Sequence, residues 1–321
     1  MDETDIQICR MLLMDSRQPY RSISKALGIS NQAVHRRVQL LEQAGVIRRY
    51  TVSLSDRFMN AVMIGIKGSS ELRCLDELVK ALERDDRTML LLFCDLDKVF
   101  ITALLRDISE LDDYLRFLTR EVKIAEPNLA FGSTLRFGED GVRQQMKKRV
   151  ELKPLDYRII RALSNDSRKP IGDLAQLLGI SAKTVKRRLE RMMEESVLEF
   201  GIDIFPGASP SAFVYFWVQV RPGVDMNVYM NRFVEKFDRH ILLSHAMSSV
   251  PGLFASLIWA PNQKIVNNLE VEVSKDPSVV WSRTNSIQDV HHFRTWRDRL
   301  IEANAEIRDN IPHRPPHEAR S

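Results

Sequence analysis

The chain has 321 residues and a net charge of +4, and 44% of its residues are hydrophobic, which suits a folded protein with two or more domains. No stretch is long and apolar enough to span a membrane, and the acidic start does not resemble a secretory signal. The cysteines, Cys9, Cys74 and Cys94, form no CxxC pair, so we expect a cytoplasmic protein without disulfides or a bound metal. We also expect no cofactor. The mildly basic net charge permits a polyanionic partner.

An internal repeat organises the chain. Residues 5–47 align without gaps on residues 156–198, at a constant offset of 151, with 16 identities in 43 positions. The shared blocks include Asp15-Ser16-Arg17, repeated as Asp166-Ser167-Arg168, and Leu27-Gly28-Ile29-Ser30, repeated as Leu178-Gly179-Ile180-Ser181. A spacing near 150 residues indicates duplication of whole domains rather than a solenoid.

The first repeat unit predicts three short helices and a strand. Apolar residues at helical spacing precede a break at Asp15 to Pro19, and alternation marks the strand. The expected elements are a helix ending near residue 14, helices at 23–27 and 31–44, and a strand at 46–54. Ser22 and Ser30 are the expected helix N-caps, with Asp173 in the place of Ser22 in the copy, and Gly28 is the expected C-terminal residue. This is the pattern of a winged helix-turn-helix.

The third helix of each unit has an apolar and a polar face. At 100° per residue, the apolar stripes are Val34, Val38 and Leu41 in the first unit and Val185, Leu189 and Met192 in the second. The opposite faces carry Arg, Lys, Gln and His, which suit the major groove of DNA, where Arg pairs with guanine and Gln with adenine. Arg37 and Arg188 lie nearer the edge and are better placed for phosphate.

The residues that we expect to contact DNA follow from these faces and from the turns that precede them. They are Ser30, Asn31, Gln32, His35, Arg36, Arg37 and Gln39 in the first unit, and Ser181, Lys183, Thr184, Lys186, Arg187 and Arg188 in the second. A charged helix face is more often simply solvated, and a helix-turn-helix can also mediate protein contacts. The recurrence of the same turn and the same Arg pair in both units favours double-stranded DNA as the partner.

Two further units follow the helix-turn-helix units, and each predicts the order β-α-β-β-α-β. In the first, strands are expected at 61–67, 88–94, 98–105 and 130–137, with helices at 71–84 and 109–122. In the second, strands are expected at 212–220, 242–248, 253–259 and 279–287, with helices at 226–237 and 263–273. One face of such a sheet is left uncovered by its own helices, so we expect it to pair with another sheet.

The fold class expected from these patterns is α+β, with two winged helix-turn-helix domains alternating with two ferredoxin-like βαββαβ domains. The expected divisions are a winged helix-turn-helix at 1–55, a ferredoxin-like domain at 60–137, a basic linker at 138–153, a second winged helix-turn-helix at 154–205, a second ferredoxin-like domain at 211–288, a C-terminal helix at 289–310 and a proline-rich disordered tail at 311–321.

These residues resemble the Lrp/AsnC family, the feast/famine transcriptional regulators of bacteria and archaea. The motifs that carry the resemblance are Asp5 and Ile8 with Leu12, Asp15-Ser16-Arg17, the Leu-Gly-Ile-Ser turn, Val34-x-Arg36-Arg37-Val38, and Leu41 followed by Gly45-Val46-Ile47. The resemblance implies a sequence-specific DNA-binding regulator whose subunits pair through their effector sheets, bind amino acids at that junction and form higher assemblies. A fused double copy implies a pseudo-dimer with two non-identical reading heads, formed within one chain or between chains.

The expected effector loops depart from the family pattern. The family usually carries a glycine followed three residues later by an aspartate between the second and third strands of the effector domain. Here the first loop lacks the glycine and the second lacks the aspartate. Candidate effector-binding residues are Asp95, Asp97, Ser248, Ser249 and Gly252, although these positions are also consistent with solvated turns.

An enzyme on the same fold is the alternative that we weighed. Siroheme decarboxylases share the two-part fold and would need inward-facing His and Arg side chains in the effector sheets. The candidates are His240, His245, His291, His292 and Arg221. No catalytic spacing accompanies them, and the enzyme hypothesis leaves the basic third helices unexplained, so we expect a regulator and not an enzyme.

Overall fold

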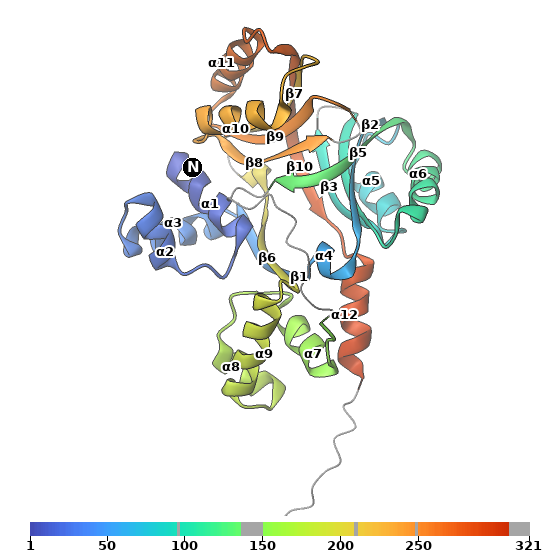
Figure 1. Cartoon of the computed structure of the whole chain (residues 1–321). Helices are drawn as coiled ribbons and strands as arrows, with labels where there is room; N and C mark the ends of the chain where they lie inside the picture. Colours follow the sequence, from blue (N-terminus) through green and yellow to red (C-terminus); the bar gives the residue numbers. More distant parts are fainter. Residues whose placement is uncertain (95–96, 136–149, 209–210, 248–249, 308–321) are drawn as a thin grey trace, which may run out of the picture.

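The computed structural model describes residues 1–94, 97–135, 150–208, 211–247 and 250–307, and it has the alternating domain order predicted from the repeat (Figure 1). Two helix-turn-helix domains, called here the first and second heads, are attached to a single barrel of strands. Residues 138–149 of the expected linker and the whole expected tail lie outside the described residues.

The first head contains three helices and a strand. They are α1 (Glu3–Met14), α2 (Tyr20–Leu27), α3 (Asn31–Gln43) and β1 (Ile47–Leu54). Ser30 caps α3 as predicted, because its hydroxyl accepts a hydrogen bond from the Ala33 backbone N–H at 3.0 Å. Gly28 ends α2 in the left-handed conformation, at φ 66°. The cap predicted at Ser22 is wrong, since Pro19 precedes the first helical residue and accepts the Ser22 backbone N–H at 2.9 Å.

The second head repeats this arrangement. Its elements are α7 (Pro154–Leu163), α8 (Ile171–Leu178), α9 (Ala182–Glu194) and β6 (Leu198–Ile204). Ser181 caps α9 by accepting the Thr184 backbone N–H at 3.2 Å. The cap predicted at Asp173 is wrong for the same reason as at Ser22: Pro170 takes the capping position and Asp173 lies in the first turn of α8, where its negative charge suits the helix dipole.

The strand of each head pairs with the strand of the other head. β1 and β6 form an antiparallel two-stranded sheet in which Tyr50 lies opposite Ile202 and Thr51 opposite Gly201. At the repeat offset of 151, these two residue pairs are exchanged by a two-fold axis. The two heads are therefore related by a pseudo-two-fold axis and joined directly to each other.

The remaining elements form two ferredoxin-like domains, as predicted. The first contains β2 (Val62–Ser70), α5 (Leu75–Leu82), β3 (Thr88–Cys94), β4 (Lys98–Leu105), α6 (Leu111–Arg120) and β5 (Ile124–Leu135), and the second contains β7 (Ala212–Val220), α10 (Met226–Lys236), β8 (Ile241–Met247), β9 (Leu253–Ala260), α11 (Gln263–Ser274) and β10 (Val279–His292). The short helix α4 (Asp56–Met59) precedes β2. In each domain the apolar faces of the two helices pack on one side of the sheet.

The two sheets join edge to edge into a closed eight-stranded barrel. β5 pairs with β8 and β10 pairs with β3, which gives the strand order β10-β3-β4-β2-β5-β8-β9-β7. The ferredoxin-like domains therefore pair within one chain. β10 continues to His292, five residues beyond its predicted end, because Asp289 to His292 pair with β3 of the other domain. The C-terminal helix, α12 (Trp296–Glu306), consequently starts later than the predicted 289.

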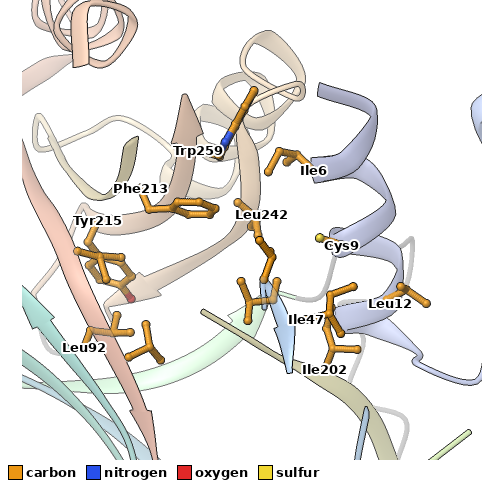
Figure 2. Close-up of a cluster of buried hydrophobic side chains, with 14 of the residues drawn as sticks. Ile6, Cys9, Leu12, Ile47, Leu92, Ile202, Phe213, Tyr215, Leu242 and Trp259 are labelled. Carbon is orange, nitrogen blue, oxygen red and sulfur yellow. The ribbon is translucent and has the colours of Figure 1, made fainter. Parts of the chain in front are cut away.

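The two heads are held against the barrel in different ways. Figure 2 shows α1 of the first head facing the barrel, with Ile6 and Cys9 near Leu242 and Trp259 in one buried apolar cluster. The second head instead packs against α12, whose Ile301 joins the apolar core formed by α7, α8 and α9 (Figure 1). The pseudo-symmetry of the chain thus stops at the contacts between heads and barrel.

Candidate nucleic-acid interface

The exposed face of α3 carries the side chains predicted to contact DNA. Val34, Val38 and Leu41 are buried against the first two helices, which confirms the angular assignment. The described side chains on the opposite face are exposed, and they are Ser30, Asn31, Gln32, His35, Arg36 and Gln39. The ring of His35 packs edge-on against Tyr20 of α2, with 5.6 Å between centroids, and this contact restricts the orientation of the imidazole.

The exposed face of α9 is more basic. Val185, Leu189 and Met192 are buried, again as predicted. Ser181, Lys183, Lys186 and Arg187 are exposed, whereas Thr184 is half-buried and its hydroxyl lies 2.9 Å from that of Ser181. Lys186 lies 3.7 Å from Glu190, an exposed pair one turn apart that contributes little stability and leaves the lysine accessible.

Arg37 and Arg188 have partners within their own heads, which the sequence did not indicate. Arg37 Nη1 contacts Asp2 at 2.7 Å and Asp5 at 2.8 Å, and the hydrogen bond that the guanidinium donates to Asp5 raises its pKa. Arg188 Nη1 contacts the Asp156 carboxylate at 2.8 Å. Each of these arginines ties the third helix of its head to the first, so the geometry supports a structural role beside the expected phosphate contact.

The two ion pairs differ in depth. The Asp156 side chain is 0% exposed and also accepts from Arg191 at 2.8 Å, whereas its counterpart Asp5 is 14% exposed and Asp2 is 53% exposed. A buried carboxylate must keep its cationic partners, because an isolated buried charge is costly, while an exposed pair is screened by water. The second head therefore depends more strongly on this link than the first.

Sequence reasoning missed two sets of arginine and lysine residues. Arg21 and Lys25 are exposed on α2, the helix that crosses the DNA backbone in helix-turn-helix complexes, whereas the copy has Gly172 and Gln176 there. The signal available in the sequence was their i, i+4 spacing on one face.

The second set is the pair of arginines in the repeated Asp-Ser-Arg motif, to which the sequence pattern assigns no contact. The Arg17 guanidinium donates to the Ser167 backbone oxygen, and the Arg168 guanidinium lies 4.1 Å from the centre of the Tyr20 ring. Both arginines thus bridge the two heads.

The described candidates for effector binding form no cluster. Asp97 is half-buried and lies 3.5 Å from its neighbour Lys98. Gly252 occupies a turn at φ 78°, and its carbonyl accepts the Val220 backbone N–H at 2.8 Å. Because a Cβ there would lie 2.9 Å from the Val220 oxygen, this glycine is required by the turn itself. Asp95, Ser248 and Ser249 lie outside the described residues.

The histidine and arginine candidates of the enzyme alternative are scattered. His240 bonds to the Trp259 carbonyl at 3.0 Å, His292 lies 3.4 Å from Asp203, and the ring of His291 packs against a neighbouring Phe. Arg221 donates to the Pro277 carbonyl at 2.7 Å. Of the five candidates, His245 lines the cavity inside the barrel. Within the described ranges, no three His, Cys, Asp or Glu side chains are grouped for a metal, and no helix could cross a membrane.

Comparison with protein families matches both heads. Residues 154–193 match the AsnC-type helix-turn-helix domain, and residues 1–48 match a winged helix-turn-helix DNA-binding model. Each head is therefore similar to a helix-turn-helix model, and the second to the AsnC type. The chain's curated relatives include the HTH-type transcriptional regulator LrpA of Pyrococcus horikoshii, 38% identical over 68 residues that make up 21% of this chain and 48% of LrpA. Another is FL11 of Pyrococcus abyssi, 31% identical over 85 residues, or 25% of this chain and 56% of FL11.

The chain spans about half the length of the curated relatives that it matches. Among solved structures, the siroheme decarboxylase NirDL is similar with a TM-score of 0.57 and 14% identity, covering 94% of this chain and 98% of NirDL. At that identity the likeness shows a shared fold over the whole chain. The relatives similar in sequence carry regulator names, and the protein similar over its full length carries an enzyme name.

Proposed function

We propose that this chain is a sequence-specific, DNA-binding transcriptional regulator of the cytoplasm, in which one chain presents two non-identical heads to a single DNA site. The observation that carries the proposal is the outward orientation of α3 and α9. Their apolar stripes are buried and their Arg, Lys, Gln and His side chains are exposed. Similarity of both heads to DNA-binding helix-turn-helix models supports it.

The exposed arginines are the residues that we assign to base recognition. Arg36 and Arg187 occupy equivalent positions on α3 and α9, both are exposed, and no ion pair to another described residue holds either of them. An unpaired guanidinium can make the bidentate contact to guanine without first breaking a bond within the protein. Arg21 and Lys25 of α2 are assigned to phosphate, which gives the first head an additional hold on the DNA backbone.

The coupling of the heads defines the kind of DNA site. The β1–β6 sheet and the paired Asp-Ser-Arg motifs fix the two heads relative to each other about a pseudo-two-fold axis. Paired helix-turn-helix domains bind half-sites at a spacing set by the protein. Since Gln32 and His35 on α3 correspond to Lys183 and Lys186 on α9, the two half-sites are expected to differ.

We do not assign decarboxylation, despite the fold shared with NirDL. The cavity between the two sheets has a volume of about 210 Å³ and is lined almost entirely by apolar side chains. A tetrapyrrole with several carboxylates needs a larger site and cationic partners for its acids, which this cavity does not offer. The outward basic helices of both heads would also be without a role in such an enzyme.

The proposal is tested by selecting bound sequences from fragmented genomic DNA and then titrating the selected duplex with the full chain at increasing salt. Several phosphate contacts from two heads should lower the affinity by roughly 10³-fold between 50 and 200 mM salt. Lys183→Ala should weaken binding, whereas Arg84→Ala, which removes one positive charge from the segment after α5 in the first ferredoxin-like domain, should not. Equal affinity for random and selected duplexes would contradict the proposal.

A further inference from the structure

The closed barrel contains a cavity that no DNA-binding role uses. It lies between the two sheets and has a volume of about 210 Å³. The residues that line it come from β2, β3 and β4 of the first domain and from β7, β8 and β9 of the second. An eight-stranded barrel has an interior that side chains just fill or that holds one small ligand. An apolar cavity of about 150 Å³ already accommodates benzene. This cavity therefore has room for a molecule with one or two rings.

One wall of the cavity is aromatic, with its rings tilted relative to one another. The Phe100 ring packs directly against Gly65, where a Cβ would lie 2.7 Å from the ring. Glycine at this position therefore leaves the space that the ring occupies. The same ring lies 4.9 Å from the Tyr215 ring and 6.1 Å from the His245 ring, centre to centre. Leu243 and Leu257 line the cavity and are only half-buried, although they lie in the middle of strands.

Two polar groups are available within this apolar lining. The Tyr215 hydroxyl lies 2.6 Å from His245 Nε2 and 3.4 Å from Nδ1, and one hydroxyl cannot serve both nitrogens well. Thr102 is half-buried, and no side-chain bond from its hydroxyl to another described residue is present. A ligand with one polar group can therefore bond to the protein from inside the cavity.

The lining is electrically neutral. Burial lowers the pKa of His245 to about 4, so its imidazole is uncharged at neutral pH. The described lining residues include no Asp, Glu, Lys or Arg. A zwitterionic amino acid would have to bury both of its charges without a counter-charge, which is strongly unfavourable.

We propose that the cavity binds one small, neutral aromatic molecule of the phenol or indole class, with its ring against Phe100 and its hydroxyl or N–H at Thr102 or His245. The site goes beyond the proposed DNA binding, because it lies inside the barrel and uses no residue of α3 or α9. The two domains bind the molecule jointly, and neither supplies the site alone. The recognised feature is an apolar ring with a single polar group and no charge.

Isothermal titration of the full chain with indole tests the site, with indole-3-carboxylate as the charged comparison. Indole should bind one per chain, and the carboxylate at least tenfold more weakly. Leu257→Phe and Leu243→Phe, two independent ways to fill the cavity, should each weaken indole binding at least tenfold while circular dichroism and binding of the selected DNA stay unchanged. Leu177→Phe, the same change on the exposed surface of α8, should leave indole affinity as in the wild type.

Thr102→Val separates the polar contact from cavity filling, since it keeps the shape and removes the hydroxyl. It should weaken the affinity for phenol several-fold and leave the affinity for toluene unchanged. Absence of indole binding to the wild type at millimolar concentration would overturn the site, as would an indole affinity in both filled variants equal to that of the wild type. Tighter binding of the carboxylate than of indole would overturn the neutral class. DNA titrations are run separately, so failure here does not affect the proposal for the heads.

Discussion

The two adjacent arginines of each third helix have different orientations and different contacts. The first arginine of each pair, Arg36 or Arg187, points outward, and the second, Arg37 or Arg188, bonds to an aspartate of the first helix. Helical geometry predicted the outward arginines from the sequence. It could not predict the ion pairs, since Asp5 and Asp156 are separated from their arginines by 32 residues and a fold of the chain.

Replacing the second arginine should affect the two heads unequally. Arg188→Ala leaves the buried Asp156 carboxylate with one cationic partner fewer, which should destabilise the second head by about 2–3 kcal/mol although Arg191 remains. Arg37→Ala removes the pairs to Asp5, which is 14% exposed, and to Asp2, which is 53% exposed, so it should cost the first head less, about 1 kcal/mol. Native-state hydrogen exchange of α9 and α3 amides measures each loss, and equal losses would show that the depth of the pair does not matter.

His245 should make the barrel sensitive to mild acid. Its pKa is about 4 in the folded chain and near 6.5 when unfolded, so the folded state resists the proton that the unfolded chain accepts. The stability it contributes is complete above pH 6.5 and is lost as the pH falls from 6.5 towards 4, with about 2 kcal/mol lost by pH 5. Urea unfolding at pH 7 and pH 5 should show a smaller loss for His245→Gln than for the wild type. An identical loss in the variant would contradict the assignment.

At the scale of elements, local signals predicted the type of each element and non-local pairing set several of the ends. Thr88–Cys94, Lys98–Leu105 and Ala212–Val220 coincide with the predicted strands, because apolar runs bounded by turn residues are local features. β10 was predicted too short, since its last residues gain their hydrogen bonds from the other domain. The N-caps predicted at Ser22 and Asp173 were wrong because a proline a few residues earlier occupies the capping position of each helix.

The contact between the two Asp-Ser-Arg motifs is a second feature that could be recognised only in the folded structure. Ser16 and Ser167 are equivalent in the repeat, and their buried hydroxyls meet at 2.6 Å across the pseudo-two-fold axis. A residue on such an axis contacts its own counterpart, so duplication alone preserves the pair. The sequence showed the identity of the two motifs but not that they contact each other.

Removing one hydroxyl of this pair should destabilise the chain by more than half of the loss caused by removing both. Ser16→Ala or Ser167→Ala leaves a buried hydroxyl without its partner and should each destabilise the chain by about 1–2 kcal/mol. The double variant should lose less than the sum, because both partners of the bond are then absent. Chemical denaturation of the three variants measures the coupling, and strictly additive losses would mean that the two hydroxyls do not interact.

For the whole molecule, duplication gives one chain what a homodimer obtains from two subunits. Barrel closure, the β1–β6 sheet and the motif at the axis connect the halves within the chain. Once the halves are fused, each copy is free to change separately, and the contacts with the barrel show this: the first head packs by α1 and the second by α12. The sequence predicted paired sheets but left open whether they pair within a chain.

The central claim is that each head reads its own half of one DNA site. Footprinting on the selected duplex, with the wild type, Arg36→Ala and Arg187→Ala, tests it most directly. Each variant should weaken specific binding by about 1–3 kcal/mol, and each should lose base discrimination in a different half of the protected region. Loss of the same half in both variants, or unchanged footprints in both, would contradict the account.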